Sequence, residues 1–212
     1  QGGDQRLETI SALVGRILPN APGKSPESTA LRRLWLMSTL RNDTVEAAAM
    51  LPWLTQDAPA LHSQLIRIVI DNPSTNKPDQ KPVVPPVVWN RITDPELVGA
   101  HPSTRLALAS SLPKLQEDQR VELARLLLSF ESDCSDHNLP HLIWSGICEL
   151  PLPRLVDLFE DCRLPPVRRF IARRISAAVN ETPAALNALL DIHVESGARE
   201  RIDGLTQAFD GW

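Results

Sequence analysis

The sequence has no apolar run that approaches the ~18–20 residues a helix needs to cross a bilayer. Its first residues, "QGGDQRLETI", also lack the basic and apolar regions of a signal peptide. Neither sign of charge is in large excess, because 22 basic and 26 acidic residues leave a net charge of −4. These absences predict a soluble chain without membrane insertion and weigh against nucleic acid as a partner, which normally requires a basic face. The start at Gln1, with no initiator methionine, indicates a fragment of a larger multidomain protein.

Cysteine is rare and forms no close pairs. Cys134, Cys148 and Cys162 stand fourteen residues apart without a C-x-x-C motif, so the spacing typical of zinc sites, redox dithiols and haem attachment is absent. We expect buried cysteines that act as small apolar residues, with one disulfide as the alternative in an oxidising compartment. The nine glycines form no phosphate loop, and no G-x-S-x-G or H-E-x-x-H motif occurs. The sequence therefore predicts no enzyme, no catalytic residue, and no cofactor or metal bound by this chain.

Helical periodicity is present in almost every segment. In "STALRRLWLMSTL", the residues Leu31, Leu34 and Trp35 follow the i, i+3, i+4 pattern of a helix that buries one face. Ser25 and Pro26 stand just before this run, as an N-cap and a first helical residue would. Comparable segments follow along the chain, and we expect about ten or eleven short helices and no strand.

The helices recur in pairs, and each second helix has an arginine in its first turns. These second helices open near Pro26, Ala58, Pro102 and Pro165, with one extra pair in the last gap, a spacing that suits HEAT-like hairpins of about 40 residues. A single hairpin cannot bury its apolar face, so stacked neighbours supply the core and the array curves into a solenoid. We predict an all-α fold, a HEAT-like α-solenoid of stacked helical hairpins that forms one domain over residues 1–212. A compact irregular helical bundle is the alternative.

One long segment breaks the helical pattern. Residues 72–89, "NPSTNKPDQKPVVPPVVW", contain five prolines among polar residues. This composition predicts a Pro-rich loop within the domain, and its valines, Val83, Val84, Val87 and Val88, are expected to pack against helices. A flexible linker between two subdomains is the alternative.

The segment "SDHNLPHLIW" is the first candidate interaction surface, formed by Asp136, His137, Asn138 and His141. Pro140 disfavours helical geometry in the residue before it, so Asn138 is the better N-cap and His137 lies outside the helix. Three roles stay open: local capping by Asp136 and Asn138, contact with a partner, and a metal site formed by His137 and His141 with an aspartate ligand.

The segment "LPPVRRFIARRISAAV" is the second candidate surface. Its four arginines are Arg168, Arg169, Arg173 and Arg174. Residues four apart share one side of a helix, so the arginines are expected to form a broad basic stripe beside the apolar one. The stripe is either a solvated face paired with acids of the preceding helix or a surface for an acidic partner or a phosphate.

Four successive segments, "ALRRLWLMSTL", "HPSTRLALASSLPKL", "DHNLPHLIWSGICEL" and "LPPVRRFIARRI", resemble the helical-repeat region of the PVC-type haem-binding CxxCH proteins of planctomycetes and related bacteria. The resemblance covers residues 28–176, and "DHNLP...IW" and "RRFIARR" are its most specific strings. It implies a parent protein in which a β-propeller similar to sugar dehydrogenases precedes the repeats and a c-type cytochrome domain follows them. This chain has neither domain, and its three cysteines match no CxxCH motif, so no site residue carries over.

The expected function is a non-catalytic helical scaffold or interaction domain. In the parent protein, a haem-linked dehydrogenase, the resemblance places it between the propeller and the cytochrome, in contact with those domains or with another protein. It also implies a periplasmic or exported location, where c-type haem is attached; any haem would belong to the parent protein. The alternative is a stand-alone HEAT-like module that binds protein or nucleic acid.

Overall fold

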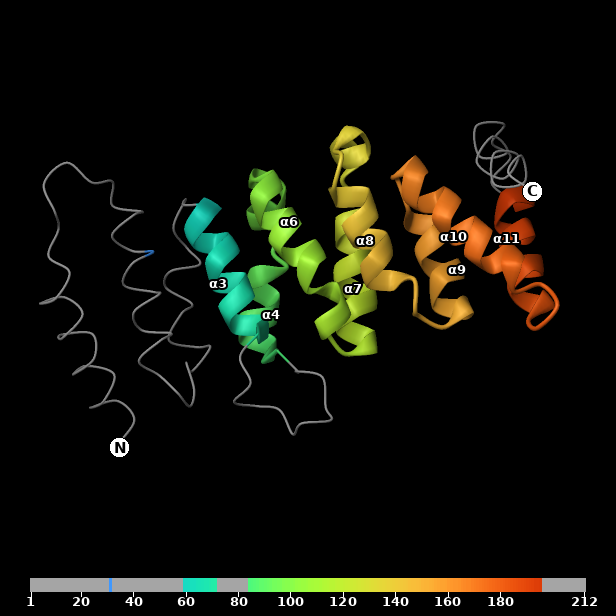
Figure 1. Ribbon diagram of the computed structural model, residues 1–212, viewed down its shortest axis with the longest axis horizontal. Coiled ribbons are helices and arrows are strands. Elements are labelled where there is room, and N and C mark those ends of the chain that lie inside the picture. The colour runs from blue at the N-terminus through green and yellow to red at the C-terminus, as the bar shows by residue number, and fades with distance from the viewer. Residues whose placement is uncertain (1–30, 32–58, 72–83, 196–212) are drawn as a thin grey trace, which may run out of the picture. The chain divides into compact units, whose positions relative to one another are not determined.

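The computed structural model describes Leu31, residues 59–71 and residues 84–195, with helices joined by turns (Figure 1). These ranges contain no strand, which confirms the prediction of an all-α fold. Among the described helices, none combines the length and the apolar character that crossing a membrane requires. The predicted cap at Ser25 and Pro26 lies outside the described residues.

The chain divides into two compact units between Ala107 and Leu108. The helices described up to the division are α3 (Pro59–Asp71), α4 (Pro86–Ile92), α5 (Pro95–Ala100) and α6 (Pro102–Ser111), whose last residues cross it. Those described after α6 are η3 (Leu112–Lys114), α7 (Glu117–Leu128), η4 (Glu131–Ser135), α8 (Leu139–Ile147), α9 (Leu152–Asp161), α10 (Pro165–Ala177) and α11 (Pro183–Glu195), where η denotes a 3-10 helix. The expectation of one domain over residues 1–212 stays a prediction.

Proline begins many of these helices, as its positions in the sequence predict. Examples are the first residues of α5, α6 and α10, namely Pro95, Pro102 and Pro165. The first N–H groups of a helix have no partner within it, so a proline there removes no hydrogen bond and presets the backbone. At α5 a side-chain cap completes the start, because Asp94 Oδ1 accepts hydrogen bonds from the N–H groups of Glu96 at 2.9 Å and Leu97 at 3.4 Å.

The predicted loop over residues 72–89 is wrong at its C-terminal end, because α4 begins at Pro86 with Pro85 as its N-cap. The two prolines occupy positions whose N–H groups a helix leaves unpaired, so they start a helix here. Trp89 is one of the buried residues of this short helix and is only 5% exposed.

The valines of this segment differ in their burial. Val84 and Val88 are buried, as expected, but Val87 is 65% exposed, contrary to the expectation that it packs against helices. On α4 the side chains of Val87 and Val88 point about 100° apart, so they cannot both face the core. Val83 and the rest of residues 72–83 lie outside the described part of the chain.

The helices after the division pack mainly on near neighbours in the sequence. α7 contacts α8 and α9, α8 contacts α10, α9 contacts α10 and α11, and α10 contacts α11. The 3-10 helix η3 also packs on α8. Fully buried aliphatic side chains from each of the five α-helices supply the core, including Leu123, Leu127, Ile143, Ile147, Leu155, Leu158, Ile171, Ile175 and Leu189.

Two buried arginines tie helix starts to the segment before them. Arg105, 4% exposed and fourth in α6, donates from Nη1 to the carbonyl oxygens of Val98 and Gly99 near the end of α5, both at 3.1 Å. Arg120, 5% exposed and fourth in α7, donates from Nη2 to the carbonyl oxygens of Pro113 and Leu115, both at 3.1 Å. These carbonyls follow or end helical turns and have no helical partner, so a guanidinium satisfies them and complements the helix dipole.

Candidate functional site

The start of α8 shows what Asp136 does. Its Oδ1 atom accepts hydrogen bonds from the backbone N–H groups of Asn138 and Leu139, both at 2.8 Å. This confirms a capping role for Asp136. The expectation that the Asn138 side chain also caps the helix is wrong, because Asn138 occupies the N-cap position without a side-chain cap hydrogen bond. His137 lies in the turn before α8, as predicted, and is exposed.

Three rings from α8 and α10 meet, and we name them the aromatic cluster: His141, Trp144 and Phe170. The rings of Trp144 and Phe170 are stacked, with centroids 5.6 Å apart and planes 29° apart. The ring of His141 lies 5.5 Å from that of Phe170, centroid to centroid, at an angle of 44°. His141 is exposed, and the other two are half-buried. The structure thus brings the two candidate segments of the sequence together through α8 and α10.

Three arginines of α10 accompany the aromatic cluster. Arg174 follows Phe170 by one helical turn, and Arg173 follows Arg169 by one turn. Arg173 and Arg174 are exposed and Arg169 is half-buried. None of the three has an ion-pair partner within the described part of the chain. We name the six residues the basic–aromatic surface: His141, Trp144, Phe170, Arg169, Arg173 and Arg174.

Arg168 has a different environment from the other three arginines. Its guanidinium carbon lies 4.6 Å from the centroid of the Phe159 ring of α9, a cation–π contact. Like Arg105 and Arg120, it is the fourth residue of its helix and reaches toward the preceding one. Arg168 therefore belongs to the contact between α9 and α10 rather than to the basic–aromatic surface.

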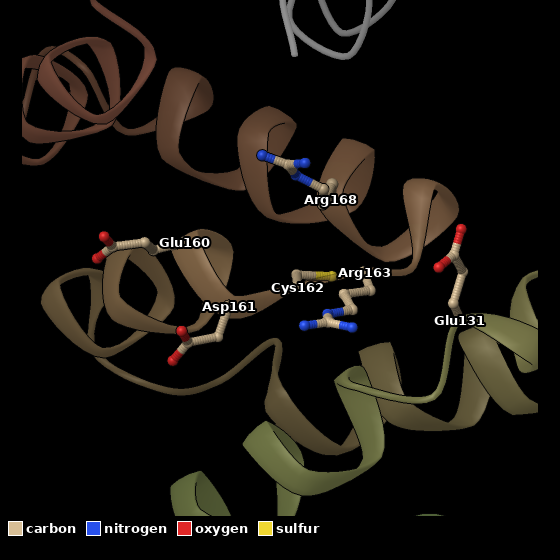
Figure 2. A pocket seen from close by; sticks show the side chains of 6 residues that line it. All are labelled: Glu131, Glu160, Asp161, Cys162, Arg163 and Arg168. Atoms are coloured by element: carbon tan, nitrogen blue, oxygen red, sulfur yellow. The ribbon is translucent and has the colours of Figure 1, made fainter. Parts of the chain in front are cut away.

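A polar pocket of about 360 Å³ lies beside that contact (Figure 2). It is lined by Glu131, Glu160, Asp161, Cys162, Arg163 and Arg168. Asp161 Oδ2 accepts a hydrogen bond at 2.8 Å from Nε of Arg125 in α7, so part of the lining charge is already paired. No sequence pattern predicts this pocket, because its lining comes from η4, the end of α9 and the start of α10, which no local pattern links.

Cys162 is the one thiol in the pocket lining, and it is not an activated nucleophile. Burial raises its pKa from 9.0 to about 11, and its sulfur donates a hydrogen bond to the carbonyl oxygen of Leu164 at 3.4 Å. A thiol rather than a thiolate therefore predominates at neutral pH. The prediction of buried cysteines is confirmed for Cys162 but wrong for Cys134, which is exposed; Cys148 is half-buried, and all three are free.

The possible metal site at His137 and His141 finds no further ligands in the structure. Within the described ranges, no three or more His, Cys, Asp or Glu side chains are grouped so that they could hold a metal ion. His141 contacts Phe170, and Asp136 caps α8. The contacts of these residues thus fit a helix start and an aromatic cluster.

Comparisons of this chain with family models, with curated proteins and with solved structures give no match. The resemblance to the PVC-type haem-binding proteins therefore stays a prediction from the sequence. Function has to be inferred from the described helices and the surfaces they form.

Proposed function

We propose that the chain is a non-catalytic helical-repeat scaffold of the HEAT-like solenoid type that binds a protein partner. The observation that supports this most strongly is the packing after the division, where each helix contacts mainly the next helix or the next but one. In a repeat array each unit touches only its neighbours, whereas a compact bundle also brings distant helices together. No pair of described α-helices further apart than this packs to a comparable extent.

The order of the contacts adds support. α7, α9 and α11 contact one another in series, and α8 contacts α10. Stacked hairpins produce such a pattern, because the first helices of successive hairpins form one row and the second helices form another. A two-row stack exposes one face of each row, and repeat proteins use such faces to bind partners.

The pocket chemistry favours binding over catalysis. Its thiol is protonated at neutral pH, since burial raises the pKa of Cys162 to about 11. Of its carboxylates, Asp161 is paired with Arg125. A catalytic site normally presents a nucleophile or base whose pKa is tuned toward the operating pH, and the shift at Cys162 goes the opposite way.

The sequence resemblance supports a more specific place for the scaffold. We expect it to separate a propeller domain and a c-type cytochrome domain in an exported, haem-linked dehydrogenase, and to contact those domains or another protein. The haem would then be held by the neighbouring domain. This part of the proposal depends on the resemblance alone.

Site-specific photo-crosslinking in cells of the source organism tests the scaffold role. A photoreactive phenylalanine replaces, one at a time, three exposed residues on different helices: Glu122 of α7, Asp157 of α9 and Arg173 of α10. A scaffold gives a discrete adduct to another protein or domain from some of these positions and not from others. The absence of any adduct, together with a stoichiometric cofactor in the visible spectrum of the purified chain, would contradict the proposal.

A further inference from the structure

We infer that the basic–aromatic surface binds an acidic segment of a protein partner that presents an aromatic or aliphatic side chain to Trp144 and Phe170. The inference rests on the proposed scaffold function and names its partner class. The surface lies on α8 and α10, which pack on each other, so its residues are held on rigid elements.

The charge of the surface selects an acidic partner. Arg169, Arg173 and Arg174 have no ion-pair partner in the described ranges, although the whole chain has a net charge of −4. Two arginines on the neighbouring helices are paired by contrast: Arg125 of α7 with Asp161 at 2.8 Å, and Arg154 of α9 with two acids of α7. A guanidinium without a carboxylate partner retains its fork of N–H donors, which matches a carboxylate in a bidentate geometry.

The aromatic cluster supplies the apolar part of the surface. Trp144 and Phe170 are only half-buried although they stack on each other, so aromatic surface remains in contact with solvent beside the arginines. Partly exposed tryptophan and arginine side chains on rigid helices are the residue types that contribute most to protein interfaces. A partner side chain that covers these rings would exclude water from the neighbouring arginine–carboxylate contacts and strengthen them.

Two observations favour an acidic protein segment over single-stranded nucleic acid. The three arginines span six residues of one helix, a rise of about 7.5 Å, whereas strand-binding grooves follow a backbone over several phosphates. In addition, one face of Trp144 and one face of Phe170 are occupied by their mutual stacking, which leaves less ring surface for bases.

Fluorescence anisotropy with the full chain tests the inference. The probe is a labelled twelve-residue peptide of glutamate and glycine with a central tryptophan; a peptide with lysine in place of glutamate and a twelve-nucleotide oligothymidine serve for comparison. The variant Arg173→Glu/Arg174→Glu removes the charge match, and Trp144→Ala removes the apolar contact. Arg163→Glu is the matched control, because Arg163 is an exposed arginine in the turn before α10 that is not part of this surface.

We expect saturable binding of the acidic peptide and none of the lysine peptide. Kd should rise about tenfold or more in Arg173→Glu/Arg174→Glu, several-fold in Trp144→Ala, and less than twofold in Arg163→Glu. The inference would be overturned if Arg163→Glu lost as much affinity for the acidic peptide as the double arginine variant does. It would also be overturned if the double variant had the same Kd as the unmodified chain. Tighter, surface-dependent binding of oligothymidine would overturn the partner class. If no probe binds but photo-adducts still form, the acidic-segment inference fails while the scaffold function stands.

Discussion

Gly146 of α8 lies so close to Leu112 of η3 that a Cβ atom added at position 146 would collide with the Cβ atom of Leu112 and lie 2.8 Å from its Cδ1 atom. Leu112 is fully buried, so it has little room to move. The absence of a side chain at Gly146 therefore sets the distance between η3 and α8.

The first prediction concerns this contact. Gly146→Ala should destabilise the chain by about 0.5–2 kcal/mol, because an overpacking cost of about 1–3 kcal/mol outweighs the gain of about 0.5–1 kcal/mol in helix propensity. Urea denaturation monitored by circular dichroism measures the change. Ser145→Ala, at the exposed neighbouring position, is the control and should change the free energy of unfolding by less than about 0.5 kcal/mol. A Gly146→Ala variant as stable as the unmodified chain would show that η3 and α8 are not in this contact.

The second prediction concerns the buried arginine of α7. Arg120→Ala should lower the free energy of unfolding by about 2–4 kcal/mol, because two carbonyl oxygens, those of Pro113 and Leu115, lose charged hydrogen-bond donors. Arg125→Ala on the same helix removes an ion pair that is half-exposed on both sides, so it should cost less than about 1 kcal/mol. Thermal or chemical denaturation measures both variants. Equal decreases in the free energy of unfolding would contradict the different roles assigned to these arginines.

The third prediction concerns pH. Burial raises the pKa of Cys162 from 9.0 to about 11, so the folded chain holds this proton more tightly than the unfolded chain. The associated stability is fully present below pH 9 and is lost as pH rises through about 11, a change of about 2–3 kcal/mol. The free energy of unfolding should fall less over this interval in Cys162→Ala than in the unmodified chain. Parallel pH curves for the two proteins would contradict the shift.

The fourth prediction concerns thiol accessibility. Under native conditions a thiol reagent such as iodoacetamide should modify the exposed Cys134 much faster than Cys162, which is 3% exposed and protonated. Peptide mass spectrometry follows both residues in one sample. In urea, which unfolds the chain, both cysteines should be modified at similar rates, and this serves as the control. Similar modification rates for the two cysteines in the native chain would show that Cys162 is not enclosed.

The helix starts could be predicted from the sequence, because proline and short polar residues determine them locally. Pro102 and Pro165 begin helices where expected, and Asp136 caps α8. α4 was missed because two adjacent prolines usually signal a loop, whereas here the burial of Trp89 outweighs that signal. That burial depends on packing, which no local pattern encodes.

The candidate surface could be predicted only in part. The arginines next to Phe170 were visible as a stripe, since residues four apart share a helix face. The contact between Trp144 and Phe170 was not, because it depends on how α8 packs on α10 across 26 residues of sequence. For the same reason the sequence grouped Arg168 with the stripe, although its guanidinium lies over Phe159.

Hydrogen exchange tests the repeat architecture most directly. Leu189→Ala leaves a cavity in α11, where Leu189 is fully buried. In a repeat array stability is a sum of local and nearest-neighbour terms, so exchange should rise in α11, α9 and α10 and stay nearly unchanged in α7. An equal rise in α7 and α11 would mean that the helices unfold as one cooperative bundle, and it would contradict the helical-repeat scaffold.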